Sequence, residues 1–481
     1  MADHDTDVRF MSDRHGPVTV GVDIGTTAVK ALAVDENGQV VARSRVPHQV
    51  LAPEPDVLRH DARRAWRIGP RRAYAEVTQQ LEASGHGQVA GVTVASMVPS
   101  LTAVNRRGVP ILPGLLYGDR EGRPPETAES FLPTSGGAPP SGAMPDGEGF
   151  LYWAVKEAPD AAGYWPCQAV ATHVIAGVPA IDTGVTASLG ALYRRGKWNS
   201  TVLEAAGVTE PQLPRVVPMC MAGGTIAGTE TVFTGGTIDA FCDQIVAGAS
   251  QPGDVLVIFG ATLIVWAVTD EWKEAPGLIS YPHSTPDRFL IGGPSNAGAL
   301  FVDWARDLLR GATRPGPDRE KYEPRIGRPD RVPVWLPYVR GERTPFDDHT
   351  LRSNLYGLDI GSGPQALERA AFEASGFVIQ RILDRAGVKG KRIVASGGGS
   401  RTTAWMAAVA DATNLPVDTV AIPEGAARGA AFIARMAAGL ETSLNDSERW
   451  VGVGRRIEPD PVWALAAASR YQRFCEVGTG E

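Results

Sequence analysis

The chain has little of what several protein classes require. Cysteine is scarce, with four in 481 residues, and none of them has the Cys-x-x-Cys or Cys/His spacing of a zinc site. We therefore expect neither a disulfide framework nor a structural zinc centre, and we interpret the cysteines as reduced core residues. They are Cys167, Cys220, Cys242 and Cys475.

Long runs of one residue type are also missing. Lys and Arg total 47 against 54 Asp and Glu, a net charge of −7 without any long basic segment, so a nucleic-acid partner is not expected. No apolar run is as long as a membrane span, and residues 1–16 are too polar for a signal peptide. We expect a cytoplasmic protein with a disordered tail at 1–16 and no membrane partner; a homodimer is left open.

What the chain does have is enough apolar sequence for two cores. At 481 residues and 43% hydrophobic content, it exceeds one typical domain. Strand-like and helical patterns occur in both halves, which predicts the α/β class. We place an N-terminal domain at 17–247 and a C-terminal domain at 248–481.

Two similar passages support this division. "GVDIGTTAVKALAV" at 21–34 and "LVIFGATLIVWAV" at 256–268 align without gaps at an offset of 235 residues, which pairs Gly25 with Gly260 and Thr27 with Thr262. Each reads as two strands joined by a Gly/Thr turn, and the Asn37-Gly38 pair predicts a further hairpin. We infer two related halves that face a shared cleft. Two unrelated hairpins that both need a glycine remain an alternative.

The turns have the composition of a phosphate-binding loop. Gly25 lets backbone N–H groups approach an anion, and the hydroxyls of Thr26 and Thr27 add donors. Asp23 could hold a magnesium ion beside that phosphate, or it could serve only to cap the turn. In the second copy, Ile258 stands opposite Asp23.

Two further segments could contribute to a nucleotide and substrate site. Gly397, Gly398 and Gly399, followed by Ser400, open a helix where a nucleotide can approach backbone amides, although such turns also serve tight packing. Asp239 is expected in the first turn of a helix, with Thr237 as a candidate cap. Asp243 follows four residues on, on the same face of that helix. Either carboxylate could accept a proton from a substrate hydroxyl or could merely suit a helix N-terminus.

Other polar residues follow apolar runs, where strand ends meet a cleft in open α/β sheets. The candidates for substrate contact are Ser96, Tyr117, Asp119 and Arg120. An Asp-Arg neighbour pair can equally form a surface salt bridge. The segment 122–149 is rich in Pro and Gly and predicts a long surface loop, whereas 365–387 has the spacing of a helix that ends at Gly387.

Taken together, these segments resemble the FGGY family of carbohydrate kinases, xylulokinase-like members in particular, within the sugar kinase, Hsp70 and actin superfamily. The resemblance rests on "VDIGTTAVKALAVDENGQVV", "PILPGLLYGDRE", "GGTIDAF", "PGDVLVIFGATLIVWAV", "GERTPF" and "IVASGGGSRTTAWMAAVAD", in the family's order. It implies two actin-like (ribonuclease H-like) domains with ATP and a sugar between them.

The resemblance also implies residue roles. Asp239 would be the catalytic base and would contact the substrate, and Asp23 would serve Mg²⁺. Phosphate and nucleotide binding would fall to the glycine and hydroxyl residues of the three loops, namely Gly25, Thr26, Thr27, Gly260, Thr262, Gly398, Gly399 and Ser400.

The chain departs from the family pattern mainly on the sugar side. "SMVPS" at 96–100 stands where many members have Ser-Gly-Gln-Met-His, Tyr117 and Gly118 replace a common tryptophan and its neighbour, and Ala407 replaces a common glutamine. We expect an ATP-dependent kinase for a ketopentose, tetrulose or alditol. The alternatives are an actin- or Hsp70-like ATPase and a nucleotide- and sugar-binding protein without catalysis.

Overall fold

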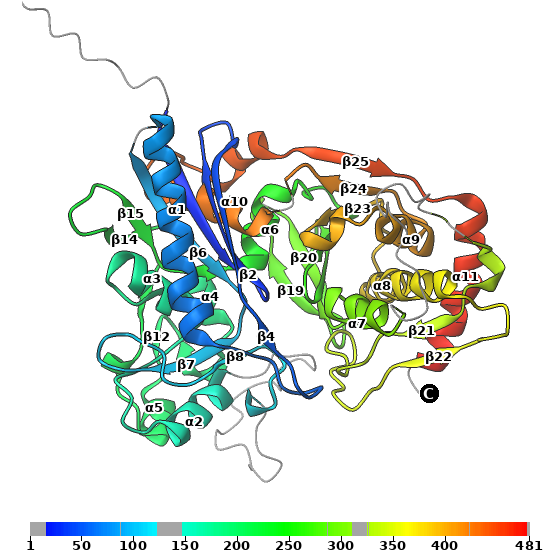
Figure 1. Cartoon of the computed structure of the whole chain (residues 1–481), viewed down its shortest axis with the longest axis horizontal. Coiled ribbons are helices and arrows are strands. Elements are labelled where there is room, and N and C mark those ends of the chain that lie inside the picture. Colours follow the sequence, from blue (N-terminus) through cyan, green and yellow to red (C-terminus); the bar gives the residue numbers. More distant parts are fainter. Residues whose placement is uncertain are drawn as a thin grey trace, which may run out of the picture.

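The computed structural model describes residues 16–86, 88–122, 147–285, 287–309, 325, 327–422 and 424–478. Residues 1–15 of the expected tail at 1–16 and most of the expected loop at 122–149 lie outside the described residues. Two mixed sheets, each with helices against it, form the two sides of the molecule (Figure 1). This is the mixed α/β, two-domain arrangement predicted from the sequence.

The first sheet has seven strands in the order β14-β15-β6-β1-β2-β3, with β16 also paired to β6. Its strands are β1 (Val18–Ile24), β2 (Ala28–Val34), β3 (Val40–Pro47), β6 (Val89–Ser96), β14 (Ala222–Thr225), β15 (Val232–Thr234) and β16 (Thr237–Ile238). A smaller sheet lies below it, made of β4 (Val50–Leu51), β5 (Arg59–His60), β7 (Ser100–Val104), β8 (Gly114–Leu116) and β9 (Gly163–Trp165).

The second sheet also has seven strands, in the order β19-β20-β18-β17-β23-β24-β25. They are β17 (Asp254–Phe259), β18 (Leu263–Thr269), β19 (Ile279–Pro282), β20 (Phe289–Ser295), β23 (Arg392–Ser396), β24 (Val417–Val420) and β25 (Val453–Ile457). Three strand pairs complete the set: β10 (Ala180–Asp182) with β13 (Arg215–Val217), β11 (Tyr193–Arg194) with β12 (Lys197–Trp198), and β21 (Val334–Leu336) with β22 (Asn354–Tyr356).

The α-helices of the first half are α1 (Gly69–Ser84), α2 (Gly147–Glu157), α3 (Cys167–Ala176), α4 (Thr183–Ala187), α5 (Ser200–Ala206) and α6 (Asp239–Ala247). Those of the second half are α7 (Ala299–Leu309), α8 (Pro364–Ala386), α9 (Thr403–Thr413), α10 (Gly425–Ala437) and α11 (Pro461–Gly478). None of the helices in these described ranges is long and apolar enough to cross a membrane.

Both predicted hairpin copies are present. β1 pairs antiparallel with β2, and β17 pairs antiparallel with β18. Both turns are closed by a backbone bond from the paired glycine, at positions that differ by one residue: the Gly25 N–H donates to Ala28 O at 3.1 Å, and the Gly260 N–H donates to Thr262 O at 3.0 Å. The predicted long helix is also confirmed, because α8 ends at Gly387, whose left-handed backbone suits glycine.

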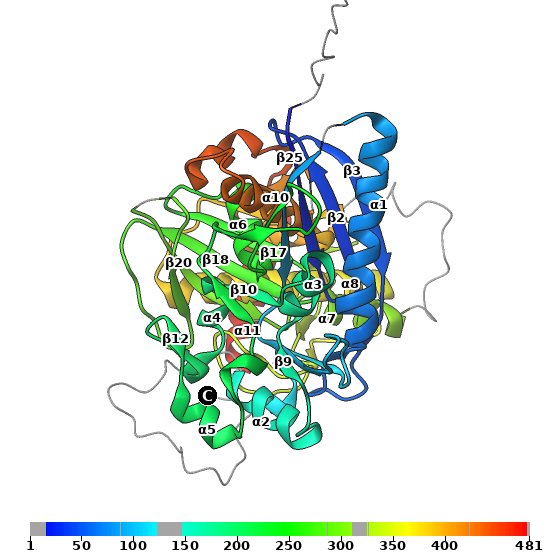
Figure 2. The same ribbon diagram turned by 90° about the vertical axis from the view of Figure 1, so that its left-hand side faces the viewer.

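Helix α10 ties the two halves together. It follows β24 of the second sheet in sequence, but it packs on β1 and β6 of the first sheet and on α6 (Figure 2). The contact is close: a Cβ on Gly21 would lie 1.7 Å from Ala427 O. In the alternation of β1, Val20 and Val22 join the core on the other face, whereas Gly21 and Asp23 face α10 and α6.

Candidate active site

A large cavity of about 840 Å³ lies between the two sheets. The residues that line it come from both halves and include most of the candidates: Asp23, Gly25, Thr26, Thr27, Tyr117, Asp239, Gly260, Thr262, Gly398 and Gly399. Both Gly/Thr turns and the glycine loop after β23 therefore meet at one place. That volume is in the range of sites for nucleotide-sized ligands.

Asp23 lies near the end of β1, and the residue is 4% exposed. The hairpin register sets it directly across from Lys30, and the Lys30 ammonium donates to Asp23 Oδ2 at 3.2 Å. The Asp23 charge raises the pKa of Lys30. Lys30 was missed in the sequence analysis, although the antiparallel register of the predicted hairpin could have indicated this pair.

Asp239 is the first residue of α6, as predicted, and its Oδ1 accepts from the Ala240 N–H at 2.7 Å. The expected cap by Thr237 is wrong, because Thr237 belongs to β16 and the N-cap of α6 is Ile238, without a side-chain bond. Burial raises the pKa of Asp239 to about 7, and the nearby charge of Asp23 adds to this rise. The carboxylate can therefore exchange a proton near neutral pH.

Asp243, one turn further along α6, also lines the cavity. Its Oδ1 accepts from Ser396 Oγ at 2.6 Å, and burial raises its pKa to about 7. Asp23, Asp239 and Asp243 thus form an acidic wall. Because burial of adjacent carboxylates is costly, a bound cation would relieve their repulsion.

The residues fit a magnesium ion held mainly by a nucleotide. No group of three or more His, Cys, Asp or Glu side chains in the described ranges is arranged to hold a metal by itself. Mg²⁺ commonly keeps several waters and takes one or two carboxylates together with substrate phosphates. One carboxylate such as Asp23, beside two phosphate-type turns, matches that requirement.

Three predicted substrate residues are not among those that line the cavity. Asp119 is fully buried, and its Oδ2 accepts from Arg59 Nε at 2.9 Å and from the Leu58 N–H at 3.0 Å. Arg120 pairs with Glu54 at the surface at 2.7 Å, and Ser96 Oγ donates to Ile24 O at 3.1 Å. These contacts favour structural roles, and a substrate contact by any of the three stays a prediction from the sequence.

Ser400, predicted to border the nucleotide, is likewise absent from the lining. It is buried, and its Oγ donates to Gly397 O at 2.7 Å, inside the glycine loop. The loop itself lines the cavity together with Arg401, Thr402 and Trp405. Ser400 therefore stabilises the conformation of the glycine loop through a hydrogen bond within it.

The wall of the cavity formed by Met97, Val98 and Tyr117 is mainly apolar. The departures at 96–100 bring Met97 and Val98 to its wall, beside Tyr117. The Tyr117 hydroxyl lies 3.2 Å from Thr26 Oγ1, which links this wall to the first Gly/Thr turn. Arg343 also lines the cavity, and the sequence analysis missed it, although it stands in the "GERTPF" segment.

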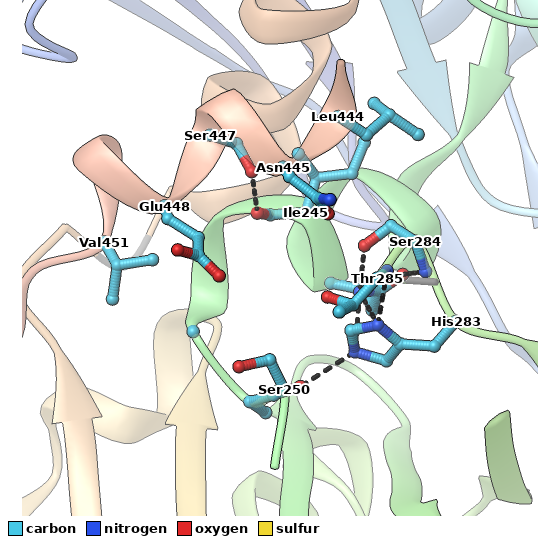
Figure 3. A pocket seen from close by; sticks show the side chains of 13 residues that line it. Ile245, Ser250, His283, Ser284, Thr285, Leu444, Asn445, Ser447, Glu448 and Val451 are labelled. Carbon is cyan, nitrogen blue, oxygen red and sulfur yellow. Dashed lines mark hydrogen bonds between the residues drawn. The ribbon is translucent and has the colours of Figure 1, made fainter. Parts of the chain in front are cut away.

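A second, much smaller cavity of about 20 Å³ lies behind α6. Figure 3 shows His283 and Ser284 on one side of it and Ser447 on the other, where Ser447 Oγ donates to Ile245 O at 2.8 Å. His283 Nδ1 accepts from the Thr285 N–H at 2.8 Å. That volume admits about one water molecule, so this is not a substrate pocket.

Comparisons with known proteins agree with this geometry. Residues 18–126 match the N-terminal domain of the FGGY family of carbohydrate kinases, and residues 255–438 match its C-terminal domain. The chain belongs to the FGGY family of carbohydrate kinases. It is therefore a sugar kinase, and this excludes the alternative that the protein is an actin- or Hsp70-like ATPase. Kinases of this family use ATP, generally with Mg²⁺.

Individual relatives are distant but extend over most of the chain. The xylulose kinase of Streptomyces rubiginosus is 28% identical over 488 residues, which cover 96% of this chain and 95% of that protein. The gluconokinase of Bacillus subtilis strain 168 is 23% identical over 474 residues, with 92% and 91% covered. The crystal structure of the xylulose kinase of Rhodospirillum rubrum has the same fold, with a TM-score of 0.75 and 23% identity over 96% of this chain and 98% of that one.

Proposed function

We propose that this FGGY kinase transfers the γ-phosphoryl group of ATP to a hydroxyl of a small sugar or polyol, such as a ketopentose, a tetrulose or an alditol. ATP would bind between the two Gly/Thr turns and the glycine loop, with the sugar beside Asp239. Residues 17–247 and 248–481 would act as the two domains that carry these sites. A cytoplasmic location, where ATP is available, belongs to the same proposal.

Asp239 is the proposed general base. It would accept the proton of the attacking hydroxyl as the new O–P bond forms and the bond to the β-phosphate oxygen of ADP breaks. The observation that carries this role is the position of its carboxylate, at the first turn of α6 on the wall of the cavity that both phosphate-type turns share. A pKa near 7 suits proton acceptance at neutral pH.

Asp23 is the proposed magnesium residue. The ion, when bound, would neutralise charge on the transferring phosphoryl group. Lys30, which donates to Asp23 in this structure, would orient that carboxylate. The amides of Thr26 and Thr27 and the backbone at Gly260 and Gly398 would bind phosphate oxygens.

The test is a screen of ketoses, alditols and aldonates by coupled ADP release, followed by two variants on the substrate found. We expect Asp239→Asn to lower kcat by roughly 10² to 10⁴-fold, the usual contribution of a positioned base, with ATP binding retained. Asp243→Asn should cost much less. The proposal fails if Asp243→Asn abolishes turnover while Asp239→Asn stays within a few-fold of the parent.

Absence of turnover with every compound would favour a protein that binds nucleotide and sugar without catalysis. In that case Asp23→Ala still tests the proposed metal site through nucleotide binding alone. Binding of a non-hydrolysable ATP analogue should become much less dependent on Mg²⁺ in that variant.

A further inference from the structure

The first Gly/Thr turn is held from behind by two histidines. His48 Nε2 lies 3.0 Å from Gly25 O, and His60 Nε2 lies 2.8 Å from Thr26 O. The backbone N–H of His48 also donates to Thr27 O at 2.9 Å. Three consecutive carbonyls of the turn thus have donors from the segment 48–60, and neither histidine is among the residues that line the cavity.

The partners fix which nitrogen carries the hydrogen. A carbonyl oxygen can only accept, so Nε2 must be the donor in both rings. In His60 the other nitrogen, Nδ1, accepts from the indole N–H of Trp66 at 3.0 Å, which requires Nδ1 to be bare. Trp66 and His60 are both fully buried, and burial lowers the pKa of His60 to about 4. The ring is therefore a neutral donor with one fixed tautomer.

The hydrogen bonds to these carbonyl groups also set the direction of the neighbouring backbone N–H groups. In a planar trans peptide the C=O of one residue and the N–H of the next point in opposite directions. With Gly25 O and Thr26 O held on the histidine side, the N–H groups of Thr26 and Thr27 point to the opposite side, where those residues line the cavity. Among the described residues, neither amide has a hydrogen-bond acceptor.

The second turn has the same arrangement with different donors. At the positions equivalent to Gly25 and Thr26, Gly260 O accepts from the Ala299 N–H at 2.9 Å and Ala261 O accepts from the Leu300 N–H at 3.0 Å. These donors are the first amides of α7. Two histidine side chains therefore donate to the carbonyl groups of the first turn, and the N-terminal amides of α7 donate to the equivalent carbonyl groups of the second.

We propose that His48 and His60 are positioning residues that hold the first Gly/Thr turn so that the amides of Thr26 and Thr27 can bind the nucleotide's phosphates. The inference rests on the proposed function, since it assumes that this turn binds phosphate. It makes phosphate affinity depend on two side chains that do not touch the nucleotide.

The test measures the dissociation constant of a non-hydrolysable ATP analogue with Mg²⁺ by calorimetry. His48→Leu and His60→Leu should each weaken binding by about 3- to 10-fold, the equivalent of one net hydrogen bond. His48→Gln, whose amide can still donate, should stay within about two-fold of the parent. His173→Leu is the matched control, a half-buried histidine of the same half that contacts neither turn.

The outcomes separate the two ideas. If the parent protein does not bind the analogue, the proposed function fails first. If the parent binds and His48→Leu binds equally well with an unchanged melting temperature, this inference is overturned. It is also overturned if His48→Gln is as weak as His48→Leu, because the loss would then follow packing and not donation. Should His60→Leu fail to fold, the comparison of His48→Leu with His48→Gln decides the test. Trp66→Phe, which leaves Nδ1 of His60 without its donor, then takes the place of His60→Leu. The Michaelis constant for the sugar should not change in any of these histidine and tryptophan variants.

Discussion

Arg343 of the second half lies over the ring of Tyr117 from the first half, with 4.9 Å between the guanidinium carbon and the ring centroid. The two side chains meet where both line the large cavity. Arg343 Nε and Nη2 are buried and have no hydrogen-bond partner in the described ranges. A buried donor without a partner is costly, so an anion in the cavity would find an available guanidinium there.

Substitution of Arg343 should therefore impair catalysis more than folding. We expect Arg343→Met to lower kcat/KM by about 10- to 100-fold, since a hydrogen bond to a charged group contributes about 1.5 to 3 kcal/mol. Arg343→Lys should recover part of the loss, because it keeps the charge but not the planar fork. Initial rates at low substrate concentration measure this, with the exposed Arg352→Met as control; equal rates for the two methionine variants would contradict it.

Asp119→Asn should act on stability. The buried carboxylate accepts from Arg59 and from the Leu58 N–H, whereas Arg59 keeps Glu121 as a second partner. We therefore expect a loss of about 1 to 3 kcal/mol in the free energy of unfolding, the cost of lost hydrogen bonds to a buried group. Denaturant melts measure it. The Michaelis constant of the folded protein should stay near that of the parent. A changed Michaelis constant at full stability would return Asp119 to the substrate contacts expected from sequence.

The activity should fall on the acid side of neutrality. Asp239 must be ionised to accept a proton, and its pKa is raised to about 7, so kcat/KM should drop about tenfold per pH unit below that value. The charge of Lys30 lowers the pKa of Asp239; hence Lys30→Met should move the midpoint to higher pH. A profile that is flat between pH 5.5 and 8 would argue against Asp239 as the base.

Gly21 is expected to tolerate no side chain. A Cβ there would lie 1.7 Å from Ala427 O of α10, and overpacking of this kind costs about 3 kcal/mol or more where backbone must move. Gly363→Ala is the control, since a Cβ at Gly363 meets nothing within 4 Å. Thermal melting of the two variants compares them directly; equal melting temperatures would mean that α10 sits less tightly on β1 than described.

The elements that could be predicted from the sequence are those that depend on residues close together in the chain. The alternation around Gly25 to Thr27 predicted the β1–β2 turn, and the glycine at 387 predicted the end of α8, because each depends on neighbours within a few residues. The partners of Asp119 could not be predicted in this way, since Arg59 comes from 60 residues away and only β5 and β8 bring them together. His48 and His60 belong to no motif, and their role follows from carbonyls that sequence does not display.

The path of the chain through α10 has a consequence for synthesis. The face of β1 that carries Asp23 is covered by a helix that ends at residue 437, so a ribosome that has completed the first sheet has not yet made its cover. Domains of many proteins fold in order as they emerge. Here the face of the first sheet against which α10 packs gains that helix only after most of the second half has been translated, and a fragment that stops at residue 247 would contain α6 but not α10.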